Sequence, residues 1–546
     1  MKKNVTKIFH RLHRQTNSVG KAAFIVALAG IMSRLLGLVR DRILASTFGA
    51  GDTLDVYNAA FRLPDLLLEL VVLGALGAAF IPVFTNFTEN KNHERAWNCA
   101  FGVLTFLLIG ISFFSLVLFL FSPVLLHFTV PGFPAEKLDL TVQFTRIMLL
   151  SPFFLGVSAI FGGILMSYRR FVFYALAPSF YNIGIITGAI VFVPVWGPIG
   201  LAWGAVFGAF LHMLSHLPAL AHRAKGVTWS FAHLAITPDI KKVATLMVPR
   251  ILASTSNQIS LFVMTFFAST LAAGSLTVIT FAGNVQGVVL GLIGIPFAVA
   301  AFPTLSAYIA KSQEKQFCKL FGRTFRRILF YVLPLSILLI LLRAQIVRVI
   351  YGGGQFDWQD TILTFQVLGI LAVSLFAQST IPLLARAFFA LHDTRRPLYA
   401  ALFSQLVMIL FIVFFIRSLD IYALAIGFSL SAIVNMLLLL FLLRKKIAVF
   451  AHHDFFDTLI KILVATAGAA LVAQSVKYIM AAIIGTIDTF FTVFAQLVIS
   501  FGAGLGAYLV IAYFLQLDEV ETLRNRMLIK IFGRSSVAAE EQNDVK

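Results

Sequence analysis

Long apolar segments follow one another along almost the whole chain, and they limit its fold more than any other feature. A helix that crosses the hydrocarbon core of a bilayer needs about 20 mostly apolar residues. Breaks in hydropathy divide the sequence into about fourteen segments of that kind. Their predicted bounds are 23–48, 56–84, 97–123, 140–166, 172–194, 197–218, 243–270, 275–306, 320–342, 361–389, 398–416, 421–443, 457–482 and 488–516. Because 59% of the residues are hydrophobic and only 12% are charged, a water-soluble enzyme is excluded and an all-α integral membrane protein is predicted.

Lysine and arginine are concentrated in alternate loops between these segments. Loops after the even-numbered segments hold clusters such as Arg169–Arg170 and the basic run 311–327, whereas the opposite loops hold few basic residues, among them Lys137 and Arg417. Cytoplasmic loops of membrane proteins carry the excess of positive charge, so both termini are predicted to lie in the cytoplasm. The formal net charge of +19 then faces anionic membrane lipids. Nucleic acid is not an expected partner, because the basic residues do not gather on one polar face.

The two halves of the sequence resemble each other at an offset of about 221–224 residues, which is typical of duplicated transporter halves. Thr47–Gly51 corresponds to Thr270–Gly274, and Ala79–Pro82 corresponds to Ala301–Pro303. Both members of each pair have the same predicted sidedness, so the repeat is parallel; chance similarity between apolar segments is the alternative. The predicted organisation is a basic amphipathic segment 1–21, a six-helix N-lobe 22–220, a cytoplasmic linker 221–242, a six-helix C-lobe 243–444, two further helices in 445–516 and a cytoplasmic tail 517–546.

Charged side chains gather on the first two segments, although charges at membrane depth are costly and usually face a cavity or each other. A helical turn places Arg34 and Asp41 on one face, and it places Arg62, Asp65 and Glu69 on one face of the next segment. The surplus of arginine suits an anionic substrate, because guanidinium groups bind phosphate bidentately. Ion pairs that only hold helices together are the alternative. The candidate cavity residues are Ser33, Arg34, Arg40, Asp41, Arg62, Pro64 as a kink, Asp65, Glu69 and, in the second half, Arg250 beside Pro249.

Other patterns that could indicate chemistry are weaker. His212 and His216 have the spacing of a metal pair, but their segment holds no third ligand, so a core or cavity-lining role is predicted and no metal site is expected. The sequence contains no phosphate-binding loop of the Walker type, so ATP hydrolysis by this chain is not expected, and neither is a cofactor. The two cysteines, Cys99 and Cys318, do not make a disulfide framework.

Several motifs resemble those of the lipid II flippase (MurJ/MviN) family. They are Ser33–Asp41, Phe48–Gly51, Asp55, Phe61–Pro64, Ala79–Pro82, Ala301–Ser306 and Arg386–Thr394. The resemblance implies a two-lobed bundle of the multidrug/oligosaccharidyl-lipid/polysaccharide exporter superfamily. It also implies that the chain moves lipid II, the undecaprenyl-diphosphate-linked precursor of peptidoglycan, from the inner to the outer leaflet of the bacterial cytoplasmic membrane. On this basis the peptidoglycan synthesis machinery is an expected partner, and Arg34, Arg40, Asp41, Asp55 and Arg62 inherit roles around a central cavity.

The sequence also departs from this family. Where many relatives have two basic residues and an acid after the proline of the second segment, this chain has Leu68, Glu69 and Leu73, and it has Gly283–Asn284 in place of an Asp–Arg pair. The cavity is therefore expected to be less cationic, with Arg250 as partial compensation. Segments 243–270, 398–416 and 421–443 contain no carboxylate, which argues against a carboxylate sodium site and leaves the membrane potential or an ion gradient, such as protons, as energy sources.

Three other functions fit parts of the sequence. A flippase for another polyprenyl-diphosphate-linked oligosaccharide, or a small-molecule exporter, would share the predicted fold. A membrane-embedded lipid-dependent transferase would need an acid or histidine on an outer loop, and the candidates Asp357 and Asp360 lack convergent partners in the sequence. A scaffold without transport is the remaining alternative, and the arginine cluster argues against it.

Overall fold

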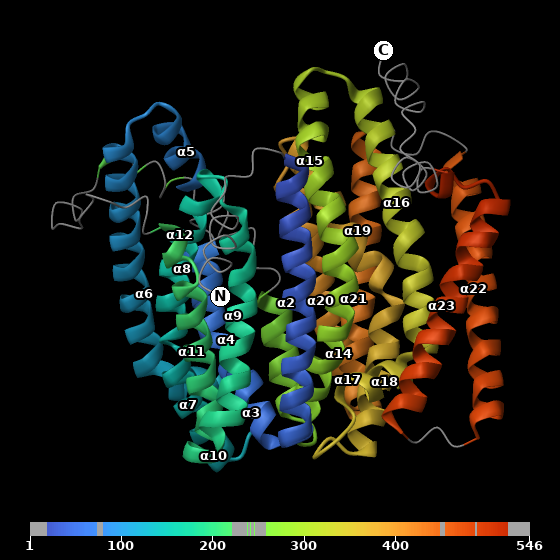
Figure 1. Cartoon of the computed structure of the whole chain (residues 1–546), viewed down its shortest axis with the longest axis horizontal. Coiled ribbons are helices and arrows are strands. Elements are labelled where there is room, and N and C mark those ends of the chain that lie inside the picture. The colour runs from blue at the N-terminus through green and yellow to red at the C-terminus, as the bar shows by residue number, and fades with distance from the viewer. Residues whose placement is uncertain are drawn as a thin grey trace, which may run out of the picture. The chain divides into compact units, whose positions relative to one another are not determined.

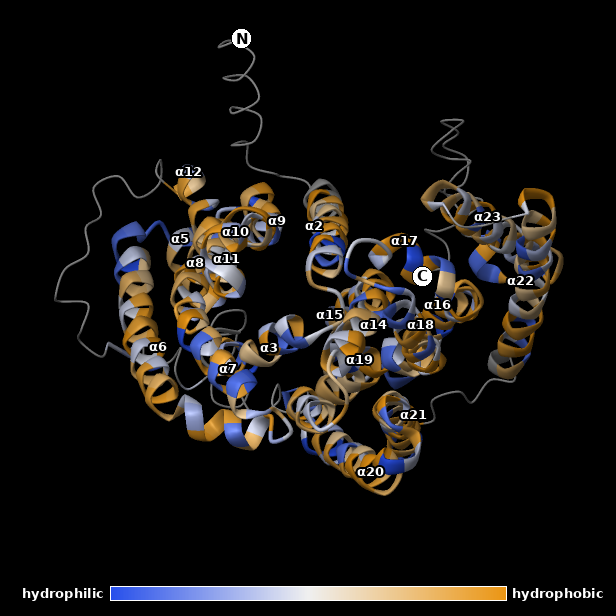
Figure 2. Cartoon of the chain, turned by 90° about the horizontal axis from the view of Figure 1, so that it is seen from below, coloured by the Kyte–Doolittle hydropathy of each residue, from blue (hydrophilic) through white to orange (hydrophobic). Residues whose placement is uncertain are grey.

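The computed structural model describes residues 19–73, 80–220, 258–447, 454–485 and 489–521, together with Thr237, Pro238, Lys241 and Thr245. Throughout these residues the regular secondary structure is helical, and an isolated bridge joins Gly353 to Phe356 (Figure 1). Hydrophobic residues extend along the length of the long helices (Figure 2). The prediction of an all-α membrane protein is therefore confirmed.

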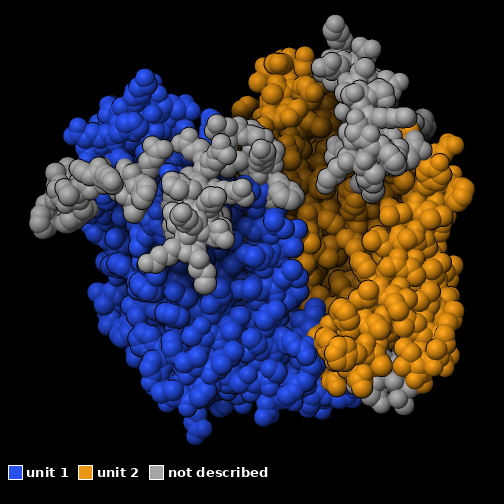
Figure 3. All heavy atoms as spheres, viewed as in Figure 1, with its two compact units in different colours: residues 1–281, 350–360 blue, residues 282–349, 361–546 orange. Residues whose placement is uncertain are grey.

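The chain forms two compact units, coloured separately in Figure 3. The first unit comprises residues 1–281 and 350–360, and the second comprises 282–349 and 361–546. The predicted domain bounds, which divide the chain differently, stay a prediction. The helices of the first unit are α2 (Val19–Phe48), α3 (Asp52–Ala60), α4 (Arg62–Leu67), η1 (Leu68–Leu73), α5 (Ile81–Glu89), α6 (His93–Thr129), α7 (Ala135–Met148), α8 (Ser151–Ser167), α9 (Phe171–Thr187), η3 (Gly188–Phe192), α10 (Val193–Trp196), η4 (Gly197–Ile199), α11 (Gly200–Leu214), α12 (Leu217–Leu220) and an unlabelled helix Gln258–Ser269.

Helix α14 (Ser275–Val289) begins in the first unit and ends in the second. The second unit continues with η6 (Leu290–Gly294), α15 (Ile295–Ala310), α16 (Glu314–Leu341), α17 (Arg343–Tyr351), α18 (Trp358–Val373), α19 (Leu375–Ala390), α20 (Arg395–Leu419), α21 (Ile421–Lys446), α22 (Asp454–Ile484) and α23 (Phe490–Phe514). Residues 350–360 belong to the first unit. They comprise the end of α17, the start of α18 and the turn between these helices.

In the part of the chain described, nine helices are long and apolar enough to cross a membrane. A tenth span is possible if α18 and α19, which are bent by 45° at Ser374, count as one. One continuous stretch, Phe171–Leu220, covers two of the predicted segments. These helices make the chain a multi-pass membrane protein, and the count of about fourteen spans stays a prediction.

Proline marks the places where the long helices change their hydrogen-bond pattern. The π-helical stretch η3 ends where α10 begins with Val193–Pro194, and η6 ends where α15 begins with Ile295–Pro296. A proline cannot donate the next hydrogen bond of an α-helix, and π-helical turns accommodate such a break. The second predicted segment is likewise interrupted: α3 ends at Ala60, and α4 carries the buried Pro64 in its first turn.

Within the first unit, glycines allow α11 to lie directly against α9 and η3. A Cβ atom added to Gly184 would lie 2.1 Å from the Cα of Gly208, and one added to Gly188 would lie 2.5 Å from the Cα of Gly204. Small residues at helix interfaces let backbones approach closely in membrane proteins. Helix α9 also packs against α2, so it lies between α11 and the helix that carries the first charged stripe.

Candidate functional site

The charged stripe of α2 is centred on an ion pair between neighbouring residues. The Nε and Nη2 atoms of Arg40 donate to Oδ1 of Asp41 over 2.8 and 2.7 Å. The Asp41 side chain is 4% exposed and that of Arg40 is 23% exposed. A carboxylate buried to this degree needs a charged or hydrogen-bonding partner, and the partly exposed side chain of Arg40 supplies it.

Asn182 on α9 fixes the orientation of this arginine. Its Oδ1 accepts a hydrogen bond from Nη1 of Arg40 over 3.0 Å. Its Nδ2 donates to the backbone oxygens of Ser33 and Pro178 over 3.1 and 3.2 Å. Ser33 therefore takes part through its carbonyl group, and one amide side chain ties α2 to α9.

Two tyrosines connect the charged stripe of α2 with that of α4. Tyr57 on α3 is buried, and Arg40, Asp41 and Asp65 act on it electrostatically. Tyr181 on α9 is subject to the charges of Arg40 and Asp65. Charges of α2 and of α4 therefore both act on these phenol groups.

The second stripe faces the helix Gln258–Ser269. The Nε of Arg62 donates to Oγ1 of Thr265 over 2.7 Å, and Asp65, one turn further along α4, interacts with Arg62 electrostatically. Glu69, at the start of η1, accepts a hydrogen bond from Gln258. In addition to the interaction between Arg62 and Asp65, Arg62 and Glu69 therefore bond to neutral side chains of a segment that is far away in the sequence.

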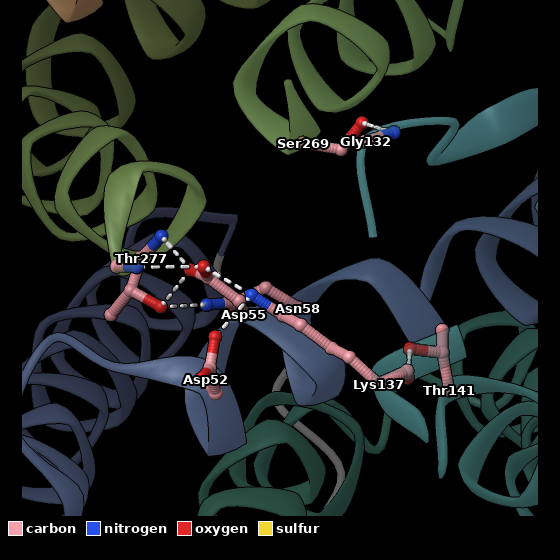
Figure 4. A network of polar contacts seen from close by, with 9 residues as sticks. Asp52, Asp55, Asn58, Gly132, Lys137, Thr141, Ser269 and Thr277 are labelled. Carbon is pink, nitrogen blue, oxygen red and sulfur yellow. Dashed lines mark hydrogen bonds and ion pairs between the residues drawn. The ribbon is translucent and has the colours of Figure 1, made fainter. Parts of the chain in front are cut away.

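Asp55 on α3 is the centre of a separate, densely bonded network (Figure 4). Its carboxylate, in a residue only 2% exposed, accepts from the backbone N–H of Gly274 over 2.8 Å. It also accepts from the N–H and Oγ1 of Thr277 over 2.9 and 2.8 Å. The Nζ of Lys137 lies 3.0 Å from Asp55 and 2.6 Å from the exposed Asp52. These bonds place a negative charge at the first turn of α14, where unpaired N–H groups favour it.

Residues 350–360 close over the end of α2 near this network. The N–H of Gln355 donates to the oxygen of Ser46 over 2.9 Å, and the N–H of Ala50 donates to Oδ2 of Asp360 over 2.9 Å. Gly354 has a φ of +60°, and a Cβ there would lie 2.2 Å from the oxygen of Ser46. Asp360 thus has a structural bond here, which is not the arrangement of a catalytic acid.

The predicted site residues fall into three groups. Ser33, Arg40, Asp41, Asp65 and the half-buried Arg62 belong to the connected polar region of the first unit, and Arg34 lies on α2 seven residues before Asp41. Glu69 bonds to Gln258, Asp55 lies in its own network, and Pro64 is packed in α4. Arg250 lies outside the described residues, as does the side chain of Leu73.

Sequence reasoning missed the neutral partners Asn182, Thr265 and Gln258, the two tyrosines, and the role of Lys137. An amide inside an apolar segment is a usable signal, because such groups are expensive in a membrane unless they are bonded. Asn182 and Gln258 both carry this signal, whereas Thr265 does not. Among the residues that the structure describes, no group of three His, Cys, Asp or Glu is arranged as metal ligands.

Comparison with known proteins gives consistent results. The sequence model of a family described as "Lipid II flippase MurJ" matches residues 44–501. A curated relative from Buchnera aphidicola, named "Probable lipid II flippase MurJ", is 31% identical over 454 residues, which cover 82% of this chain and 88% of the relative.

Two solved structures share the fold. One is titled "Lipid II flippase MurJ, inward closed conformation"; it has a TM-score of 0.71 and 21% identity, and the match covers 91% of this chain and all of that one. The other is an inward-facing multidrug resistance MATE family transporter of the MOP superfamily, with a TM-score of 0.67, 17% identity and coverage of 78% and 98%. The expected exporter fold is therefore confirmed.

Proposed function

Because this chain belongs to the lipid II flippase MurJ family, we propose that it moves lipid II from the inner to the outer leaflet of the bacterial cytoplasmic membrane by alternating access. The match of the family's sequence model to residues 44–501 carries this proposal. The chain is a transporter and not an enzyme, and lipid II is its substrate. The multidrug transporter with the same fold supports a mechanism in which a central site is exposed to each side in turn.

The substrate diphosphate binds at the cluster of Arg34, Arg40 and Arg62, with Arg250 contributing. Arg40 supports this assignment best, because Asn182 and Asp41 hold its guanidinium in a fixed orientation while 23% of the side chain stays exposed. A preoriented guanidinium loses less conformational entropy on binding. Each charge-assisted hydrogen bond to the diphosphate contributes about 1.5–3 kcal/mol.

Asp41 and Asp65 lower the net positive charge of this region. They make the binding of a dianionic headgroup reversible, which a transporter needs in order to release its substrate. Both termini and the basic loops lie on the cytoplasmic side, so the headgroup enters from there. The polyprenyl chain stays among the membrane lipids, and the peptidoglycan synthesis machinery takes up the product. No bound cofactor is required, and the energy comes from the membrane potential or an ion gradient.

Complementation tests this function. We expect the chain to restore growth to a bacterium depleted of its own lipid II flippase and to restore lipid II at the outer face of the membrane. Arg34→Ala and Arg40→Lys should abolish both, because the first removes a charge and the second keeps the charge but loses the bidentate fork. Arg323→Ala is the matched control, since Arg323 is an exposed residue of α16 outside the cluster.

Expression and thermal stability of each variant separate loss of function from loss of folding. Full activity of both arginine variants would refute the diphosphate site. If the parent chain is folded in the membrane but does not expose lipid II, the substrate assignment fails. Competition by other polyprenyl-diphosphate sugars or by small drugs in a binding assay then identifies which substrate replaces it.

A further inference from the structure

Ser158, His212 and His216 form a polar cluster inside the first unit, away from the arginine site. Ser158 lies on α8, His212 lies on α11, and His216 lies in the turn that follows α11. The Oγ of Ser158 is 2.6 Å from Nδ1 of His212 and 3.0 Å from Nδ1 of His216. Ser158 is fully buried and His216 is 1% exposed, whereas His212 is partly exposed.

The chemistry of the serine hydroxyl restricts how protons are distributed in this cluster. A hydroxyl has one proton to give, so it can donate to only one of the two Nδ1 atoms and must accept from the other. One imidazole therefore carries its proton on Nδ1 and the other carries it on Nε2. The three residues form a continuous hydrogen-bonded chain from one ring to the other.

The Nε2 atom of His216 ends this chain in a buried position. Among the residues that the structure describes, it has no hydrogen-bond partner, and an unsatisfied buried polar atom of this kind is unfavourable. It lies beside Gly162, where an added Cβ would be 3.6 Å from it. When His216 carries its proton on Nδ1, the lone pair of this Nε2 is free to accept another proton.

The surroundings supply no carboxylate that would fix the charge. Neither imidazole is bonded or ion-paired to an acid within the described residues. From α9, the ring of Tyr174 packs beside Gly162, and Arg170 donates from Nη1 to the oxygen of Ala219 over 2.7 Å. A second excess proton would place two cations next to each other and near Arg170, which is unfavourable.

Three charged groups of other elements that pack against α8 or α11 are bonded elsewhere. Arg146 of α7 donates to the oxygen of Phe119 and to Ser122. Arg62 of α4 bonds to Thr265, and Glu69 of η1 bonds to Gln258.

We propose that Ser158, His212 and His216 are a proton-binding site of this transporter, which holds one excess proton shared between the two imidazoles. A proton binds to Nε2 of His216. The Nδ1 proton of His216 then passes to the serine oxygen as the serine proton passes to Nδ1 of His212. His216 becomes neutral, Ser158 keeps one proton, and the positive charge moves to His212, the more exposed ring.

This site connects with the arginine cluster through α9. Tyr174 of α9 and His216 both lie beside Gly162, Gly184 of α9 contacts α11, and Asn182 of the same helix holds Arg40. Occupancy of the proton site therefore acts on the helix that positions the diphosphate-binding arginine. The coupling to the arginine cluster rests on the proposed function. It makes the proton the ion that drives or regulates lipid II transport.

The binding of the proton is tested without transport, on the purified full-length protein labelled with ¹⁵N at histidine. We expect NMR to show that the rings of His212 and His216 titrate in one coupled step as the pH is lowered. Ser158→Ala should uncouple them, and His127→Gln, which changes a histidine on α6, should leave the step unchanged. Two rings that titrate independently in the parent, or that stay neutral down to the pH at which the protein unfolds, would overturn the proposal.

Transport in proteoliposomes then tests the coupling. In the pH range where the binding of one proton limits transport, the rate of lipid II movement should change by about tenfold per pH unit. His216→Gln and Ser158→Ala should flatten this profile while lipid II still binds, and His127→Gln should keep it. An unchanged profile in His216→Gln would show that the site does not couple to transport. If the parent moves no lipid II, the proposed function fails, and the NMR titration still decides whether the proton site exists.

Discussion

At the scale of single residues, Asp55 joins α3 to the start of α14. Its carboxylate binds Lys137 and accepts one hydrogen bond from Gly274, just before α14, and two from Thr277 in the first turn of that helix. Thr277 lies 222 positions after Asp55, so the two residues occupy equivalent places in the predicted repeat. The start of α3 is thus bonded to the start of α14, which the predicted repeat makes its equivalent.

We expect Asp55→Asn to destabilise the protein by about 3 kcal/mol, because it leaves Lys137 without its buried counter-ion. Asp52→Asn is the matched control. Asp52 contacts the same lysine, but its side chain is 68% exposed, so its loss should cost less than about 1 kcal/mol. Thermal unfolding in detergent measures both. Equal effects of the two substitutions would contradict the assigned role of burial.

The partners of the arginines show what can be predicted residue by residue. Arg34, Arg40 and Arg62 are visible in the sequence because a charge in an apolar segment is rare and costly. Asn182 is 142 positions from Arg40, and Thr265 is 203 positions from Arg62. Helical periodicity relates residues within a few turns only, so it cannot identify bonds over such separations.

At the scale of elements, the close contact between α9 and α11 depends on glycine. We expect Gly184→Ala to destabilise the protein by about 1–3 kcal/mol or more, because the added Cβ would meet the backbone of Gly208 at 2.1 Å and backbone atoms cannot rotate away. Gly502→Ala, in the middle of α23, should be neutral or slightly stabilising, since nothing lies within 4 Å of its added Cβ.

Expression level and thermal unfolding check this pair of substitutions. A loss of stability in Gly502→Ala that equals the loss in Gly184→Ala would contradict the role of the backbone contact, because alanine favours the helix more than glycine does. Gly504 differs from Gly502 and Gly506 on the same helix, because a Cβ on Gly504 would lie 2.8 Å from Leu338 and 2.9 Å from the Cβ of Ala473.

Element boundaries could be predicted only in part. The apolar segments correspond to helices because bilayer thickness and backbone hydrogen bonding leave little other choice. For the second segment, the sequence predicts a kink at Pro64. It does not predict the division into α3, α4 and η1. The short helix α17 lies after residue 342, where the sequence predicts a loop. Hydropathy does not reveal this helix, because its nine residues include arginines and a glutamine.

At the scale of the whole molecule, the alternation of basic loops makes a prediction about sidedness. After replacement of Cys99 and Cys318 by serine, Glu136→Cys and Lys315→Cys introduce single thiols at exposed positions in opposite sets of loops. In intact cells, a membrane-impermeant maleimide should label Glu136→Cys and should label Lys315→Cys only after permeabilisation. Labelling of both from outside would contradict the predicted topology.

The fold class and the transporter family follow from local patterns spread over the whole chain, which is why they could be predicted. The substrate site depends on few residues, and Arg250, one of its four predicted arginines, lies outside the described residues. For His212 and His216, the sequence predicts a core or cavity-lining role, because their segment holds no third metal ligand. Their relation to Ser158, 54 and 58 positions away, appears only in three dimensions.

The π-helical stretches have a consequence for how the length of this chain can change. A π-helical turn contains one residue more than the α-helical turn it replaces, so it absorbs an insertion without rotating the helices on either side. Removing one residue from η6 would convert it into an α-helical turn and leave the faces of α14 and α15 in place. Removing one from the middle of α6 would turn every following side chain of that helix by about 100°. Insertions and deletions are therefore tolerated inside the membrane at η6, where sequence comparison by hydropathy alone would place no gap.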